Sequence, residues 1–67
     1  ILNNKILINK DILNINIYNI NGDLILNYQN IRSKETINLS HLKTGIYIIS
    51  ITDYNNKNKQ IKTFIIS

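Results

Sequence analysis

The fold class of this chain is decided by one stretch, Leu13-Asn14-Ile15-Asn16-Ile17-Tyr18-Asn19-Ile20-Asn21-Gly22-Asp23-Leu24-Ile25. Its first five residues alternate strictly between apolar and polar, which is the pattern of a strand with one buried face. The alternation predicts that Leu13, Ile15 and Ile17 share that face. Asn21-Gly22 is expected to form a type I′ hairpin turn, whose two central positions both need positive φ. The stretch is therefore predicted to be a β-hairpin.

Strands are predicted on both sides of this turn and further along the chain. The run 46–51 is β-branched and aromatic almost throughout, which is typical of a central strand buried on both faces. Residues 53–58 are expected to form a polar turn, and residues 40–45 offer one helical turn at most, with Ser40 as its cap and Gly45 as its end. The predicted strands lie at residues 5–8, 13–17, 24–28, 35–39, 46–51 and 59–66.

Six strands separated by turns predict an all-β fold. A sandwich and a small barrel both fit this pattern, and we favour a small antiparallel β-sandwich, immunoglobulin-like or Greek-key, with six to seven strands. The 67 residues allow one domain, since domains typically run to about 100–200 residues. A chain of this length buries only about 60% of its unfolded surface. Its core therefore needs many large apolar side chains, which 17 Ile residues help to supply.

Composition argues against a membrane protein and against a nucleic-acid binder. No apolar run approaches the ~18 residues of a membrane span, and the N-terminal residues do not resemble a signal peptide. The net charge is +4, but it comes almost entirely from Lys, with Arg32 as the single Arg. A basic oligonucleotide-binding barrel is a third hypothesis, supported only by Lys62 and Phe64 at a spacing of two. We expect a monomer, with no nucleic-acid partner and no direct membrane insertion.

The residues that catalysis or metal binding would need are few. Without Cys, the chain has no disulfide, no thiolate zinc site and no cysteine nucleophile. His41 is the single histidine, and the carboxylates are scattered without metal-ligand spacing. Ser40 beside His41 is not a catalytic pair, because adjacent residues usually point apart and no nucleophile elbow is present. We expect a protein that is not an enzyme and that uses no cofactor and no metal.

Three segments, taken together, resemble a known family. Residues 15–25 are similar to the v-x-I-Y-n-x-x-G-x-x-v hairpin of type A C-terminal sorting domains, which belong to the type IX (Por) secretion system of Bacteroidetes. Residues 37–48 look like the i-d-l-s-x-L-x-x-G-x-Y-x-x-x-i motif of that family, whose last position falls on Ile51, and residues 59–66 resemble its Lys-bearing last strand. The chain contains no proline, whereas the family pattern usually opens with a Pro-Asn-Pro stretch before its first strand. Either residues 1–67 start just after that stretch or this member has diverged there. The positions that match the family motifs are Tyr18, Gly22, Leu39, Leu42, Gly45, Tyr47 and Ile51.

Each motif position also has a structural reading, because any sandwich with this topology would need it. Gly22 and Gly45 are expected to adopt left-handed backbone conformations. Leu39 and Leu42 are expected in the core. One face of the strand over 46–51 is expected to carry a row of large side chains, namely Tyr47, Ile49 and Ile51.

The resemblance implies that residues 1–67 are a single C-terminal sorting domain, fused to a cargo protein that precedes it. The domain would be a non-catalytic secretion signal that directs this cargo through the outer-membrane type IX translocon. Its partners would be that translocon, shuttle proteins and a surface sortase-like peptidase that removes the signal. The protein would pass through the periplasm and end at the cell surface or outside the cell.

The surface that such partners would recognise is expected among exposed polar segments. Our candidate is the lysine set near the C-terminus, since charge steers encounters between proteins. Two turns, 21–23 and 43–44, are further candidates. The alternative function is a structural immunoglobulin-like or fibronectin-like β-sandwich module of a surface adhesin, which shares the architecture without the sorting role. The lysines of the candidate recognition surface are Lys57, Lys59 and Lys62.

Overall fold

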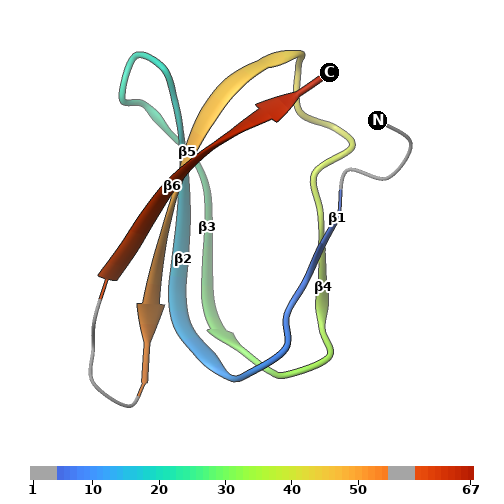
Figure 1. Ribbon diagram of the computed structural model, residues 1–67, viewed down its shortest axis with the longest axis vertical. Coiled ribbons are helices and arrows are strands. Elements are labelled where there is room, and N and C mark those ends of the chain that lie inside the picture. Colours follow the sequence, from blue (N-terminus) through green and yellow to red (C-terminus); the bar gives the residue numbers. More distant parts are fainter. Residues whose placement is uncertain (1–4, 55–58) are drawn as a thin grey trace.

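The computed structural model describes residues 5–54 and 59–67, and in these ranges the chain is folded into strands without a helix. All strand pairs are antiparallel. The six predicted strands are therefore confirmed, with small differences at their ends (Figure 1). They are β1 (Lys5–Leu7), β2 (Ile12–Asn19), β3 (Leu24–Ile31), β4 (Thr36–Asn38), β5 (Gly45–Asp53) and β6 (Lys59–Ile66).

The strands form two sheets that face each other. The larger sheet has the order β3-β2-β5-β6, and the smaller sheet consists of β1 and β4. In Figure 1 the smaller sheet lies along one side of the larger one, so that the two make the layers of a small sandwich. A closed barrel would require β6 to pair on both sides, whereas within the described ranges it pairs with β5 alone. The sandwich prediction is thus confirmed.

The core lies between the two sheets and consists mainly of isoleucine. Ile15 and Ile17 of β2 are completely buried. The strand register places Ile15 beside Ile51 of β5, and Ile17 beside Ile49. Since directly paired residues share a face, β2 and β5 carry one continuous apolar surface. Burying an isoleucine side chain stabilises the fold by about 1.5–3 kcal/mol. The smaller sheet and its flanking residues close the core with Ile8, Ile37 and Leu39.

The predicted inner face of β2 is wrong at its first position. Leu13 is only half-buried, and Ile12 takes the core position with 4% of its surface exposed. The register of β2 against β5 shifts between Ile12 and Asn14. A bulge of this kind adds one residue to a strand and reverses the alternation beyond it. The bulge therefore turns Ile12, and not Leu13, toward the core.

The β2–β3 turn lies where it was predicted but belongs to another type. Of its two central candidates only Gly22 has a positive φ, +88°, so the turn is not type I′. The Gly22 amide donates to the Asn19 carbonyl, and the Asn19 amide donates to the Asp23 carbonyl, both at 3.0 Å. This is a type I turn followed by a left-handed glycine. The Asn19 side chain selects it, because its Oδ1 accepts hydrogen bonds from the amides of Asn21 and Asp23 at 2.9 Å.

The expected helical turn after β4 is a β-turn. The Leu42 amide donates to the Leu39 carbonyl at 3.0 Å. The Ser40 amide donates to Oδ1 of Asn38 at 2.9 Å. Asn38, and not Ser40, is therefore the side chain that caps this segment, because asparagine readily accepts a hydrogen bond from the amide two residues on.

Tyr47 joins the β5–β6 pair to the loop before it. The side chain is buried, and its ring stacks on Phe64 of β6 with the ring centres 5.7 Å apart. Its hydroxyl donates a hydrogen bond to the Lys43 carbonyl at 2.6 Å. The ring therefore contributes to the core, while the hydroxyl ties the loop that precedes β5 to this strand.

The outer face of the larger sheet is polar at one end of β2 and β3, and it carries a mixture of apolar and polar side chains over β5 and β6. Asn14 and Asn16 lie on this face, and the side-chain amide of Asn27 donates to Oδ1 of both. On β5, Ser50 is buried but Ile46 is 45% exposed. The expectation that β5 is buried on both faces is therefore only half correct, because no second layer among the described residues covers this side of the sheet.

The turn geometry predicts different costs for two substitutions at Gly22. Gly22→Val should lower the free energy of unfolding by about 1 to 2 kcal/mol, because an L-residue is strained at this φ. A Cβ at Gly22 would meet no atom within 4 Å, so the cost arises from the backbone alone. Gly22→Asn should lose less, since Asn tolerates the left-handed conformation. Urea denaturation followed by circular dichroism measures both losses, and equal losses would contradict this account of the turn.

A second substitution tests the contact of Tyr47 with the loop. Tyr47→Phe keeps the ring stack but removes the donor to the Lys43 carbonyl, and should lower the free energy of unfolding by about 1 kcal/mol. Tyr18→Phe is the matched control, since the Tyr18 hydroxyl has no hydrogen-bond partner in the part of the chain that the structure describes. The control should change stability by less than about 0.5 kcal/mol. A loss at Tyr18 as large as that at Tyr47 would argue against the hydrogen bond.

Candidate functional site

The motif positions fall into two structural groups, of which the larger is part of the core. Leu39 and Tyr47 are buried, and Leu42 and Ile51 are half-buried and pack against the buried cluster. Leu39 and Leu42 face the core from the β-turn between β4 and β5, as expected. These four positions stabilise the fold by packing in or against the core. They can affect recognition by a partner only by keeping the domain folded.

The other motif positions lie at the ends of strands and on the outer face. Tyr18 is half-buried on the outer face of the larger sheet, beside Ile48 of β5. Gly22 is exposed in the β2–β3 turn. Gly45 has a φ of +159°, close to fully extended, and it begins β5 opposite Ile66. The positive φ expected at Gly45 is therefore present, and L-residues rarely adopt it, although the value lies at the extended end of that range and far from the left-handed helical region.

The lysines of the candidate recognition surface do not form one strip. Lys57 lies outside the described residues. Lys59 and Lys62 are both exposed on β6, and they pair with Thr52 and Ile49 of β5 without any register shift. Side chains three positions apart in a regular strand point to opposite faces. Lys59 thus lies on the outer face, and Lys62 lies on the inner face beside the opening of the core.

The hypothesis of an oligonucleotide binder loses its aromatic residue in the structure. A single-strand binder offers exposed rings on which bases stack. Phe64 is instead half-buried against the core and stacks on Tyr47. Lys62 and Phe64 share a strand face, as their spacing indicated, but that face is the inner one.

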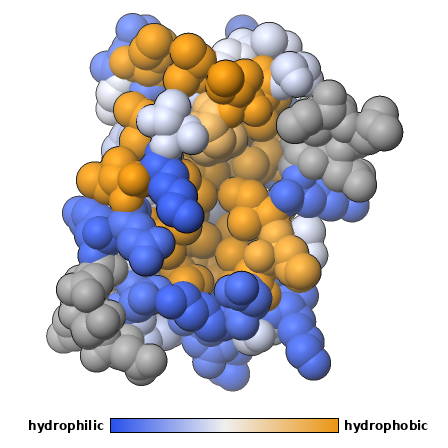
Figure 2. All heavy atoms as spheres, in the orientation of Figure 1, coloured by the Kyte–Doolittle hydropathy of each residue, from blue (hydrophilic) through white to orange (hydrophobic). Residues whose placement is uncertain are grey.

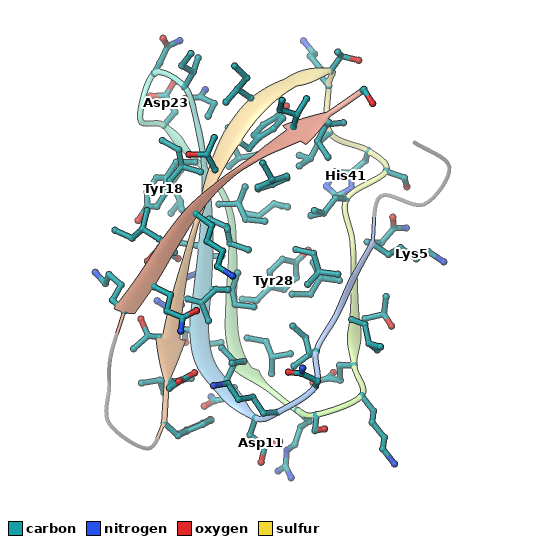
Figure 3. All side chains as sticks on the ribbon, in the orientation of Figure 1. Lys5, Asp11, Tyr18, Asp23, Tyr28 and His41 are labelled. Carbon is teal, nitrogen blue, oxygen red and sulfur yellow. The ribbon has the colours of Figure 1, made fainter. Side chains whose placement is uncertain are left out.

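The polar side chains that could serve in catalysis or metal binding are either exposed in a turn or engaged in local hydrogen bonds and ion pairs. Ser40 and His41 are both exposed in the β-turn that follows β4, where Figure 3 labels His41. The four carboxylates support loops: Asp11 accepts from the Ser33 amide, Glu35 from the Arg32 amide and Asp23 from the Asn19 side chain, and Asp53 pairs with Lys10. In residues 5–54 and 59–67, no three His, Cys, Asp or Glu side chains gather as a metal site would require. The same ranges contain no helix of the length and apolarity that a membrane crossing takes.

The structure adds a groove that the sequence analysis missed. An apolar hollow of about 380 Å³ opens between β6 of the larger sheet and β1 of the smaller one. Figure 2 shows apolar side chains at the bottom of this hollow. Its walls include Phe64 and Ile66 from β6, and Ile6 from β1. The last strand carries three consecutive apolar residues, at 64–66, and therefore has apolar side chains on both faces. This run was the one signal in the sequence for an apolar groove beside β6.

Comparison with known proteins gives one match. A family model described as the secretion system C-terminal sorting domain matches residues 2–67. No curated protein and no solved structure matches the chain. The match extends the resemblance back from residue 15 to residue 2, and so includes β1. Because the match covers essentially the whole chain, the chain belongs to the family of secretion system C-terminal sorting domains, the sorting signals of type IX secretion in Bacteroidetes.

Proposed function

We propose that this chain is a non-catalytic signal that directs a fused cargo through the outer-membrane type IX translocon and is removed at the cell surface. The single observation that carries the proposal is the family match over residues 2–67. Type IX sorting signals bring their proteins to the cell surface or out of the cell by interacting with the secretion machinery. This family is in general not one of enzymes. The steps proposed here are transit through the periplasm, capture by shuttle proteins and the translocon, and release by a sortase-like peptidase.

The proposed mechanism is the presentation of a folded surface. Four of the seven motif positions are core or near-core residues, so their substitution would act on export through the fold. The exposed elements left for direct contact are the β2–β3 turn at 21–23, the loop at 43–44 and the two faces of β6. Of these, β6 combines positive charge with exposed main chain at the rim of an apolar groove. We therefore favour β6 as the strand that the export machinery contacts.

A fusion experiment tests the proposal. Residues 1–67 are placed behind an export signal and a folded reporter in a Bacteroidetes host that has type IX secretion. Most of the reporter should reach the cell surface or the medium, and the same fusion in a strain without the translocon should remain in the periplasm. Reporter that stays in the periplasm of the competent host would contradict the sorting role and favour the adhesin module.

Single charge reversals test which face of β6 matters for export. Lys62→Glu should lower the exported fraction severalfold, because it reverses the charge beside the groove. Lys59→Glu changes the net charge equally but lies on the outer face, and should leave export near the wild-type level. Both residues are exposed, so circular dichroism of the purified variants should confirm an unchanged fold. Equal effects of the two variants would show that overall charge matters and that the face does not.

A further inference from the structure

Strand β6 is an edge strand of the larger sheet, and one of its two sides is paired with another strand. All eight of its residues are matched with residues of β5 on one side. Its other side has no strand partner in the described ranges, so it offers a row of main-chain donors and acceptors. Ile61 and Ile65 on this strand are 65% and 63% exposed. Long, regular and apolar edges of this kind are those that accept an added strand.

The opposite edge of the sheet is less suited to strand addition. Its strand, β3, contains a register shift against β2 near Leu24. Bulges of this type twist an edge away from further pairing. β6 pairs with β5 without a shift over its whole length. The regular edge of the sheet is therefore the one formed by β6.

The groove beside β6 would receive the side chains of an added strand. Its apolar wall combines side chains from β1, from β5, from β6 and from the residue that follows β4. These side chains are Ile6, Ile49, Ile51, Phe64, Ile66 and Leu39. A second hollow of about 300 Å³ shares Ile6, Ile51 and Lys62 with it and continues along the same seam toward Ile8. A strand placed beside β6 would direct every second side chain into this space. Apolar side chains there would cover the partly exposed rim of the core.

The charges along the seam favour an acidic partner. Lys62 lies at the junction of the two hollows, and the structure shows no carboxylate within ion-pair distance of it among the described residues. The one carboxylate at the seam, Asp53, is already paired with Lys10 at 3.0 Å. Lys5 on β1 also lines the groove and adds further positive charge there. A second copy of this chain would bring like charges to the seam, which is unfavourable.

We propose that this seam, meaning the free edge of β6 and the apolar groove between β6 and β1, binds an extended segment of a partner protein that is apolar and carries an acidic residue at the level of Lys62. The segment pairs antiparallel with β6. Its inward side chains are apolar opposite Phe64 and Ile66 and acidic opposite Lys62. The inference goes beyond the sorting role, since it holds for any partner that presents such a segment.

A synthetic peptide tests the proposal on the purified chain. The probe is the fluorescently labelled peptide Thr-Val-Thr-Ile-Thr-Glu-Ser, blocked at both ends. When it pairs antiparallel with β6, its Val, Ile and Glu form one row opposite Ile66, Phe64 and Lys62. Binding is followed by fluorescence anisotropy. Lys62→Glu should weaken binding about fivefold, as expected for reversing one charge in a cross-strand pair. Replacing Glu by Lys in the peptide should weaken binding to the wild type and restore binding to Lys62→Glu, an exchange that a merely structural effect would not produce.

Two further arms separate strand addition from non-specific attraction. N-methylation of alternate peptide amides, in each of the two possible frames, should abolish binding in one frame and spare it in the other, because only one set of amides faces β6. Lys59→Glu is the matched protein control and should weaken binding less than Lys62→Glu. Absence of binding, equal effects of both frames, or equal effects of the two lysines would overturn the proposal. A concentration-dependent dimer in sedimentation, competing with the peptide, would assign the seam to a second copy instead.

Discussion

The register between β2 and β5 is the constraint on which the rest of the structure depends. It brings Ile15 beside Ile51 and Ile17 beside Ile49, and so makes the centre of the apolar face against which the smaller sheet packs. A shift of one residue would turn this whole set of side chains to the solvent. The bulge near Leu13 shows how closely the register is held, since the strand absorbs one extra residue there and still buries Ile12.

The small size of the chain explains why the sandwich is open. The larger sheet has four strands, and the two short strands β1 and β4 cover only its inner face. Apolar side chains consequently remain exposed on the outer face, with Ile46 as an example. The core is also open along the seam between β6 and β1. Exposed apolar surface of this kind usually marks an interaction site, and here it lies beside an unmatched sheet edge.

A sorting signal and a stable fold make compatible demands on this sequence. The motif positions Leu39, Leu42 and Tyr47 pack the turn before β5 against the core, so the features that identify the family also hold the domain together. In the function proposed above, partners recognise the residues that remain exposed on the folded domain. Lys59 and Lys62 illustrate this division, because the strand separates them onto two faces that a partner would meet from different sides.

The sequence by itself determined the strands, the hairpin and the family. Alternation over 13–17, the glycine at position 22 and the apolar run at 46–51 are local signals, and each led to the correct element. The sequence could also have placed Lys59 and Lys62 on opposite faces of their strand, since residues three positions apart alternate in direction. The bulge at Leu13, the backbone conformation of Gly45 opposite Ile66 and the groove beside β6 depended on the tertiary structure. The physical reason is that these features arise where distant strands meet. A local pattern specifies which residues alternate, but only packing of β2 on β5 and of β1 across the sheet decides which side is buried and which edge stays open.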